Sequence, residues 1–294
     1  MLNDFRYAVR VLQRSPGFAA TAILSMAIGT AACTAVFSVA YTLLLRPLSV
    51  PRPQEIVSIY SVSKVKGGFG SLSMPNYRAL AGRDDLFEAV GAYVRLPFLL
   101  DDGNRSERIY GEVVTGGDHA LLGLSPAIGR LLTPSDDQAG AAMVVVLSHK
   151  YWEQQFGADP GAIGRVVRLN THPVEIVGVM PASFQGILLD WGGSPALWVP
   201  VAHLRHLSSS FARADVEEKR GVPWLQVTAR LRQGISPRVA ETALREQATR
   251  LAREYPDTNS DTTFSVLPAA RARFWPGRRA DAVDQAGALF AAVA

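Results

Sequence analysis

The longest uninterrupted apolar segment of the chain lies close to its N-terminus. Residues 18–45 read FAATAILSMAIGTAACTAVFSVAYTLLL and contain no charged side chain. At about 1.5 Å per residue a helix of this length reaches roughly 42 Å, which exceeds the roughly 30 Å hydrocarbon layer of a bilayer. The segment therefore predicts a transmembrane helix that runs from Phe18 to Leu45.

A cleaved signal peptide is the main alternative. The apolar region of a signal peptide spans only about 7–15 residues, and a cleavage site with small residues follows soon after. Here the apolar run is longer and ends in three leucines, Leu43 to Leu45, followed by Arg46 and Pro47. These features favour a retained helix over a cleaved one.

Small side chains recur along the predicted membrane helix. Ser25, Gly29 and Cys33 are spaced four residues apart and therefore share one side of a helix. Rows of this kind let a second membrane helix approach closely, so we expect packing in a helix bundle rather than a lone anchor.

The residues before the membrane helix form a second pattern. Apolar side chains fall on one helical stripe, which predicts an amphipathic interfacial helix over residues 1–17. Ser15, Pro16 and Gly17 are expected to break this helix and turn the chain into the bilayer. An unstructured basic tail is the alternative for this segment.

The C-terminal segment is apolar as well. Residues 286–294 read AGALFAAVA, which is too short to cross a bilayer as a helix. We interpret these residues as the first turns of a second transmembrane helix that continues in a longer chain. A frayed tail is the alternative.

Between these ends, residues 47–280 show the patterns of a folded domain. Short runs of apolar and β-branched residues predict strands, and residues 182–222 are expected to be irregular. Serines that precede helical patterns are predicted to be N-caps. The strands are expected at 55–61, 89–94, 97–100, 108–114, 143–147, 165–169, 174–180, 225–231 and 263–267, and the helices at 73–81, 149–156 and 236–255.

The order of these elements predicts the fold class. Two strand–helix–strand units, at 55–94 and 225–267, flank a middle region that is richer in strands. This arrangement predicts an α+β fold behind one N-terminal transmembrane helix. We expect a split α/β subdomain at about 50–110 and 221–275, with a β-rich subdomain inserted at about 111–220.

Charge and cysteine content exclude some classes of function. The net charge is only +4, and basic residues are not clustered with aromatic ones, so no nucleic-acid interface is indicated. The single cysteine, Cys33, lies in the apolar segment, so the large domain has no disulfide. Arginines before the helix slightly outnumber those just after it, which favours an inside N-terminus and an extracytoplasmic domain.

No catalytic constellation is evident in the sequence. The chain has no phosphate-binding loop of the Walker type, and no HExxH arrangement accompanies His203 and His206, for which a surface role is expected. Asp136 and Asp137 are interpreted as a solvated turn rather than a cation site. The sequence therefore predicts a protein that is not an enzyme and has no metal or cofactor.

A series of short motifs in fixed order carries a family resemblance. The motifs read LGLSPAIGR at 122–130, VLSHKYW at 146–152, FGADP at 156–160, IGR at 163–165, VGVMP at 177–181 and LWVP at 197–200. The series resembles the periplasmic core domain of MacB-like permeases. The positions that carry it are Gly129, Arg130, Trp152, Phe156, Gly157, Asp159, Pro160, Gly164, Arg165, Gly178, Pro181, Trp198 and Pro200.

Further matches extend the resemblance along the chain. Ala229-Arg230-Leu231 fits the same family, and three N-terminal motifs, at 14–18, 34–38 and 44–48, resemble the branch called acidobacterial duplicated orphan permeases. That branch is named for lacking an adjacent ATPase.

The resemblance implies a membrane permease subunit of the ABC-type, FtsX-like class in the bacterial inner membrane. ATP hydrolysis would belong to a separate ATPase subunit, and the extracytoplasmic domain would couple helix movement to a periplasmic substrate or adaptor. A homodimer or a second permease half is a further expected partner, besides the lipid bilayer. The alternative is an interaction module that binds a cell-envelope partner without transport.

Overall fold

The structure is a computed structural model that describes residues 16–40, 48–103, 105–187, 193–212 and 215–272. The chain forms two units, one from residues 1–46 with 281–294 and the other from residues 47–280, which we call the large domain. Most of the predicted interfacial helix, the end of the predicted span at 41–45 and the apolar segment 286–294 lie outside the described residues.

Helix α2 (Pro16–Ala40) forms from the apolar segment. Pro16 and Gly17 lie in its first turn, where a proline loses no hydrogen bond. The predicted break begins at Ser15, which lies outside the described residues. The hydroxyl of Thr21 donates to the Gly17 carbonyl, and that of Thr34 donates to the Thr30 carbonyl, so these polar groups need no water. Among the described residues, α2 is the one helix long and apolar enough to cross a membrane.

Two strand–helix–strand units interleave in the large domain. Neighbouring strands in the order β11-β1-β10-β3 are all antiparallel, so β1 is parallel to β3 and β10 is parallel to β11. This is the split βαβ arrangement of ferredoxin-like sheets. The elements are β1 (Ile56–Ser63), α3 (Met74–Ala81), β3 (Phe87–Asp101), β10 (Gln226–Leu231), α8 (Pro237–Glu254) and β11 (Thr262–Pro268). We call β1, β10 and β11 the flanking strands.

The same sheet continues through the middle of the sequence. From β3 the order is β4-β9-β6-β8-β5, which completes an eleven-stranded sheet together with β2 (Phe69–Gly70) and β7 (Val166–Leu169). We call β4 to β9 the middle strands; they are β4 (Ser106–Val114), β5 (Ile128–Gly129), β6 (Val144–Leu147), β7, β8 (His172–Val179) and β9 (Leu197–Pro200). Short helices connect them: α4 (Asp118–Leu122), α5 (His149–Phe156), α6 (Leu204–Leu207) and α7 (Ser209–Ala212), while α9 (Pro256–Asn259) follows α8.

The predicted α+β class, with an apolar N-terminal helix ahead of the domain, is confirmed. Ser73, Ser148 and Ser236 cap α3, α5 and α8 as expected, each by accepting a hydrogen bond from a backbone amide of the first turn. The division into two subdomains stays a prediction, since β3 belongs to both parts of one sheet.

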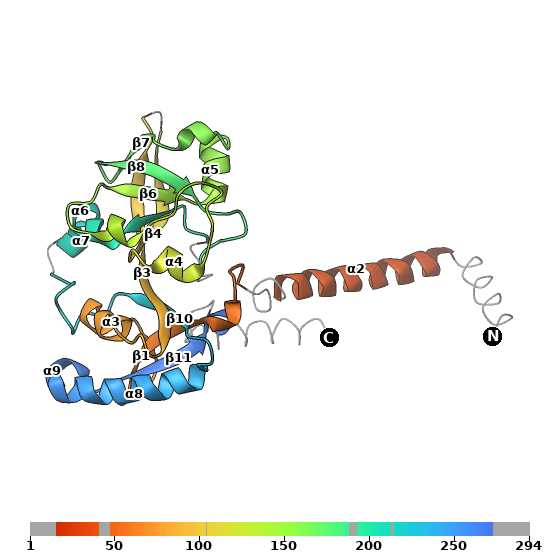
Figure 1. Cartoon of the computed structure of the whole chain (residues 1–294). Helices are drawn as coiled ribbons and strands as arrows, with labels where there is room; N and C mark the ends of the chain where they lie inside the picture. Colours follow the sequence, from red (N-terminus) through yellow and green to blue (C-terminus); the bar gives the residue numbers. More distant parts are fainter. Residues whose placement is uncertain (1–15, 41–47, 104, 188–192, 213–214, 273–294) are drawn as a thin grey trace. The chain divides into compact units, whose positions relative to one another are not determined.

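Strand β3 corrects the expectation of two separate strands at 89–94 and 97–100. It is a single strand that pairs with β10 up to Tyr93 and with β4 from Tyr93 to Asp101 (Figure 1). Pro97 is tolerated inside it because the edge of β3 opposite β4 has no partner strand between Tyr93 and Leu100, within the described residues. A proline is accommodated at such an edge since it has no N–H to offer.

Strand β9 corrects the expectation that residues 182–222 are irregular. Leu197, Trp198, Val199 and Pro200 form a strand between β4 and β6, and all four are buried. A four-residue strand that is buried on both faces has no alternation of apolar and polar residues, so periodicity does not reveal it.

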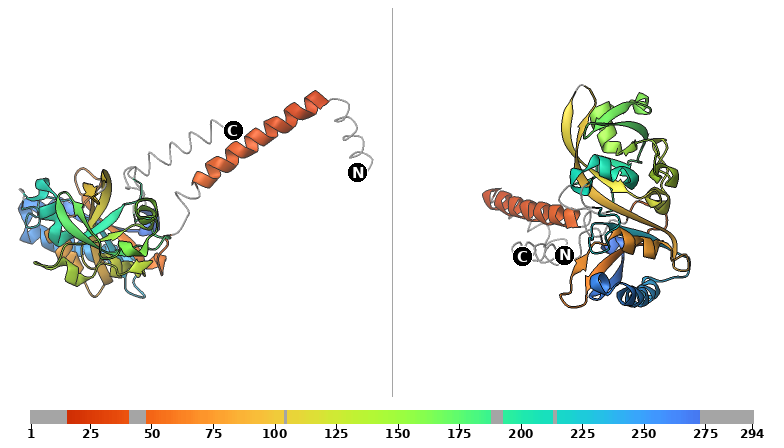
Figure 2. Two further views of the ribbon diagram at one scale, coloured as in Figure 1. Left: turned by 90° about the horizontal axis from the view of Figure 1, so that it is seen from above. Right: turned by 90° about the vertical axis from the view of Figure 1, so that its left-hand side faces the viewer.

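The sheet carries a hydrophobic core on each face. On one face α8 packs Ala240, Leu244 and Leu251 against the flanking strands, as Figures 1 and 2 show for the blue helix beside β11. The other core contains Ile56, Tyr93, Val114, Leu121, Leu122 and Trp198. The second core therefore joins α4 to both flanking and middle strands.

We expect Gly178→Ala to destabilise the large domain strongly. A Cβ at Gly178 would lie 1.9 Å from the Arg130 carbonyl oxygen, so β5 would have to move away from β8. Overpacking of this kind costs about 3 kcal/mol of unfolding free energy. Urea unfolding of the detergent-solubilised chain, followed by tryptophan fluorescence, measures the change. Gly82→Ala is the control, because its Cβ meets no atom within 4 Å and its φ is negative.

Candidate functional site

The predicted motif residues do not converge on one site. Gly129 and Gly178 are paired partners of β5 and β8, and a Cβ on either one would collide with the opposite backbone. Gly129 also adopts a positive φ of 69°. These two glycines therefore allow a close approach of two strands.

A second group of motif residues shapes the turn after α5. Gly157 ends the helix in the left-handed region, at φ 61°, and Phe156 packs against the core. The indole of Trp152 donates to the Asp159 carbonyl at 2.9 Å, and the Asp159 carboxylate accepts from the Gly161 amide at 2.8 Å. The remaining members of this turn are Pro160, which opens the 3-10 turn Pro160–Ala162, Gly164 at φ 82°, and Arg165, which lies 3.4 Å from Asp159.

Trp198 belongs to a buried ion-pair network. Its indole donates to Glu112 at 2.7 Å, and the Arg95 guanidinium donates to the same carboxylate at 3.1 Å. Glu112 is only 4% exposed, so this carboxylate is desolvated and held by two donors. The prolines Pro181 and Pro200 lie at chain reversals, where the Pro181 carbonyl accepts from Phe184 and Pro200 ends β9.

Asp136 and Asp137 correct the prediction of a solvated turn. Both oxygens of the Asp136 carboxylate accept hydrogen bonds from Arg130, at 2.7 and 2.8 Å. Although burial raises the pKa of Asp136, the bonds from Arg130 and Thr133 lower it to about 2. Asp137 accepts the backbone amides of Gly116 and Ala202, and so ties three loops together.

The remaining sequence candidates are placed as follows. Ser25, Gly29 and Cys33 are exposed along α2, and Leu45 lies outside the described residues. His203 is buried, against the expectation of a surface role, while His206 is exposed. Among the described residues, no group of three or more His, Cys, Asp or Glu side chains could hold a metal ion.

The strongest candidate for a functional site is the junction where the chain enters and leaves the large domain. We call residues 48–55 the leading segment and residues 268–272 the trailing segment. Leu48, Val50 and Ala269 are buried in one core together with Leu121 of α4. Leu48, eight positions after the last residue of α2, is therefore packed beside the trailing segment.

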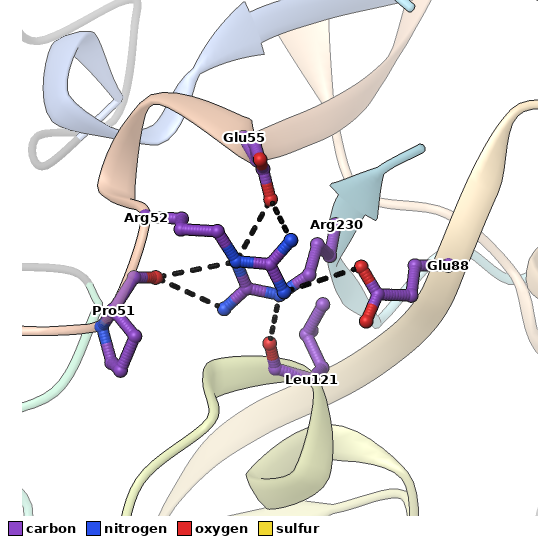
Figure 3. Close-up of polar contacts among 6 residues, drawn as sticks. All are labelled: Pro51, Arg52, Glu55, Glu88, Leu121 and Arg230. Carbon is purple, nitrogen blue, oxygen red and sulfur yellow. Dashed lines mark hydrogen bonds and ion pairs between the residues drawn. The ribbon is translucent and has the colours of Figure 1, made fainter. Parts of the chain in front are cut away.

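Arg230 is the polar centre of this junction (Figure 3). Its Nε donates to the Leu121 carbonyl at 2.9 Å, and both terminal nitrogens donate to the Pro51 carbonyl at 3.2 Å. Nη1 also lies 3.3 Å from the Glu55 carboxylate, which Arg52 approaches to 3.0 Å. Arg230 is 3% exposed, so these acceptors replace the water that the charge has lost.

Two ionisable side chains of α4 lie buried close to this junction. Asp118 is 2% exposed, and one of its oxygens has no hydrogen-bond partner. Burial raises the pKa of Asp118 well above its ordinary value, and the negative charge of Glu112 raises it further. Burial lowers the pKa of His119 to about 3, so this imidazole is neutral and accepts the Leu132 amide at 3.2 Å.

The comparisons with known proteins decide the family. Residues 19–247 match the family described as the MacB-like periplasmic core domain. The chain belongs to this family. No curated protein matches the chain.

Solved structures share the fold of this MacB-like chain. The periplasmic region of MacB from Actinobacillus actinomycetemcomitans is 17% identical, with a TM-score of 0.53, over 83% of this chain and 96% of that one. The extracellular domain of the noncanonic ABC-type transporter YknZ from Gram-positive bacteria is 17% identical, with a TM-score of 0.50, over 72% and 99%. At these identities the likeness concerns the fold, while the family match identifies a MacB/FtsX-like permease component.

Sequence analysis did not single out Arg230 in this MacB-like domain. It lies within the motif Ala229-Arg230-Leu231, and every position from Val227 to Leu231 is buried. The only charged residue of a largely buried strand is the signal that could have identified it, because such a charge needs several partners.

We expect Arg230→Met to lower the unfolding free energy of the large domain by about 3 kcal/mol, because it removes a buried donor from Glu55 and from the Pro51 and Leu121 carbonyls. Urea unfolding in detergent measures the loss. Arg245→Met is the control, since its pair with Glu241 lies on the exposed side of α8 and contributes less than about 0.5 kcal/mol. Equal losses in the two variants would contradict the central role of Arg230.

Asp118→Asn is expected to change how stability depends on pH. Since the pKa of Asp118 is raised on folding, the wild-type domain loses stability as pH rises above the unfolded value of about 3.9. The variant lacks this loss, so the difference in unfolding free energy between the variant and the wild type shifts in favour of the variant from pH 4 to pH 8, as measured by thermal unfolding.

Asp136→Asn should behave in the opposite way. The lowered pKa of Asp136 stabilises the wild type at neutral pH, and this contribution disappears as pH falls towards 2.

Proposed function

We propose that this protein is a membrane subunit of an ABC-type export or mechanotransmission system, and that its large domain lies outside the cytoplasm and follows the movement of the membrane helix. The family match supports a permease component. ATP hydrolysis belongs to a separate subunit in this proposal.

The observation that carries the proposal is the junction. Leu48 lies only a few residues beyond the apolar helix, and it is buried in the same core as Trp198 of the middle strands. Protein cores are close-packed and transmit displacement rather than absorb it. In this proposal, movement of the membrane helix reaches the domain through the leading segment.

Co-purification tests the role as a permease subunit. When the tagged chain is isolated in mild detergent from cells that express it natively, we expect an ABC ATPase to co-purify. A charge-reversal variant in the large domain, Arg245→Glu, is the control and should leave this association unchanged, because its exposed pair lies on α8. Absence of any ATPase from the complex would contradict ATP-driven mechanotransmission.

Cysteine labelling tests the location of the large domain. Val65 is 83% exposed and lies in the loop after β1, so Val65→Cys in a Cys33→Ser background gives one accessible thiol. We expect a membrane-impermeant maleimide to label it in intact spheroplasts. Labelling only after lysis would place the domain in the cytoplasm and contradict the proposal.

An exposed apolar surface favours the second candidate function, that of an interaction module. Leu99 and Tyr110 are each nearly half exposed on the paired strands β3 and β4, and Pro97 lies opposite Tyr110. Partners in register point to the same face of a sheet, so these side chains form one patch. Tyr110→Glu should abolish binding of a cell-envelope partner but leave co-purification of an ATPase intact.

A further inference from the structure

We infer that Arg230 latches the leading segment to helix α4, so that the two move as one unit and displacement of the leading segment reaches the middle strands through α4. This inference rests on the proposed function, because it names the residue that would carry the movement. It assigns a positioning role to Arg230, which donates to backbone carbonyls of the leading segment and of α4.

The Arg230 side chain holds two segments of the chain at once. The guanidinium donates to Pro51 of the leading segment on one side and to Leu121 of α4 on the other. Both acceptors are backbone carbonyls, so the bonds fix the chain itself rather than mobile side chains. A planar guanidinium offers its donors in a rigid fork, and therefore holds the two segments at a set separation.

The backbone of Arg230 is held within the sheet. It lies on β10, where it is paired with Ile56 of β1 and with Ala89 of β3. A lysine in its place would keep the charge but would lose the fork, since its single ammonium cannot hold both carbonyls in the same geometry.

Helix α4 packs against strand β3 and contacts the middle strands. Its first residue, Asp118, packs directly on β3, since a Cβ at Gly91 would lie 2.8 Å from the Asp118 Cα. His119 accepts the Leu132 amide and meets the Trp198 ring of β9 edge to face, with centroids 6.1 Å apart. Helix α4 therefore touches β3, the loop before β6 and strand β9.

A route through β1 is the alternative. The leading segment runs into β1 at Ile56, but β1 pairs only with β2, β10 and β11 among the described strands. By strand pairing, the middle strands are reached from β1 across β10 and β3. The route through Arg230 and α4 crosses one guanidinium, and Leu48 and Val50 pack in the same core as Leu121.

Hydrogen–deuterium exchange of the full chain in detergent tests the latch. In Arg230→Met we expect exchange in residues 48–55 and 118–122 to rise together, by about tenfold or more, as for a lost hydrogen bond to a charged group. Arg230→Lys should show the same joint rise. Arg130→Met is the matched control, because it removes an arginine–carboxylate pair of the middle region and should loosen residues 133–137 alone.

A disulfide provides the decisive rescue. A Cβ at Gly123 would lie 3.9 Å from the Pro51 Cβ, within the usual 3.5–4.5 Å range for disulfides, so Pro51→Cys with Gly123→Cys can join the leading segment to the end of α4. The pair is placed in a Cys33→Ser, Arg230→Met background. We expect oxidation to restore protection in both segments and reduction to remove it. The positive φ of Gly123 strains the cysteine in both redox states alike, so their difference reports the link.

Three results would overturn the inference. Exchange that rises in residues 48–55 while α4 stays protected would mean that displacement passes through β1. Exchange that rises by the same factor in every segment, or protection that oxidation fails to restore, would mean that Arg230 acts on global stability alone. Failure to find an ATPase partner would refute the proposed function but leave these exchange results, and the latch, unchanged.

Discussion

The desolvation of one guanidinium constrains the architecture of the large domain. Arg230 is the penultimate residue of the buried strand β10, where a charge is tolerated only if acceptors replace its water. Pro51 and Glu55 of the leading segment and Leu121 of α4 supply those acceptors, although these two segments are far apart in sequence. The charge thus requires that the start of the domain and helix α4 close over β10, which brings the leading segment against the core.

The residues by which the family is recognised perform a different task. Gly129 and Gly178 permit two backbones to touch, Gly157 ends a helix, and Trp152 and Asp159 fix the turn that follows. None of them joins a cluster of reactive groups within the described residues. The motif residues therefore stabilise the fold. The contacts between the segments of the domain are a stronger indication of its function than any pocket.

Three buried ionisable side chains, Glu112, Asp118 and His119, lie on strand β4 and helix α4. Glu112 is balanced by Arg95 and Trp198, whereas Asp118 and His119 each retain a buried atom without a hydrogen-bond partner. Unpaired buried polar atoms cost stability. Part of this cost falls at α4, which packs in the same core as residues of both groups of strands. Among the described residues, the other such atoms belong to Arg83, His203, Gln226 and Thr228.

Local chemistry determined much of this protein at the level of sequence. The uncharged apolar run specified α2, the serine caps and helix-ending Gly157 specified α3, α5 and α8, and the ordered motifs specified the family. These features depend on neighbours along the chain, which a sequence displays directly. Tertiary structure alone decided that the two strand–helix–strand units interleave, that β9 enters the centre of the sheet and that Arg230 meets Pro51 and Leu121. Those outcomes depend on which buried surfaces and charges find each other across more than a hundred residues, and no local pattern encodes that pairing.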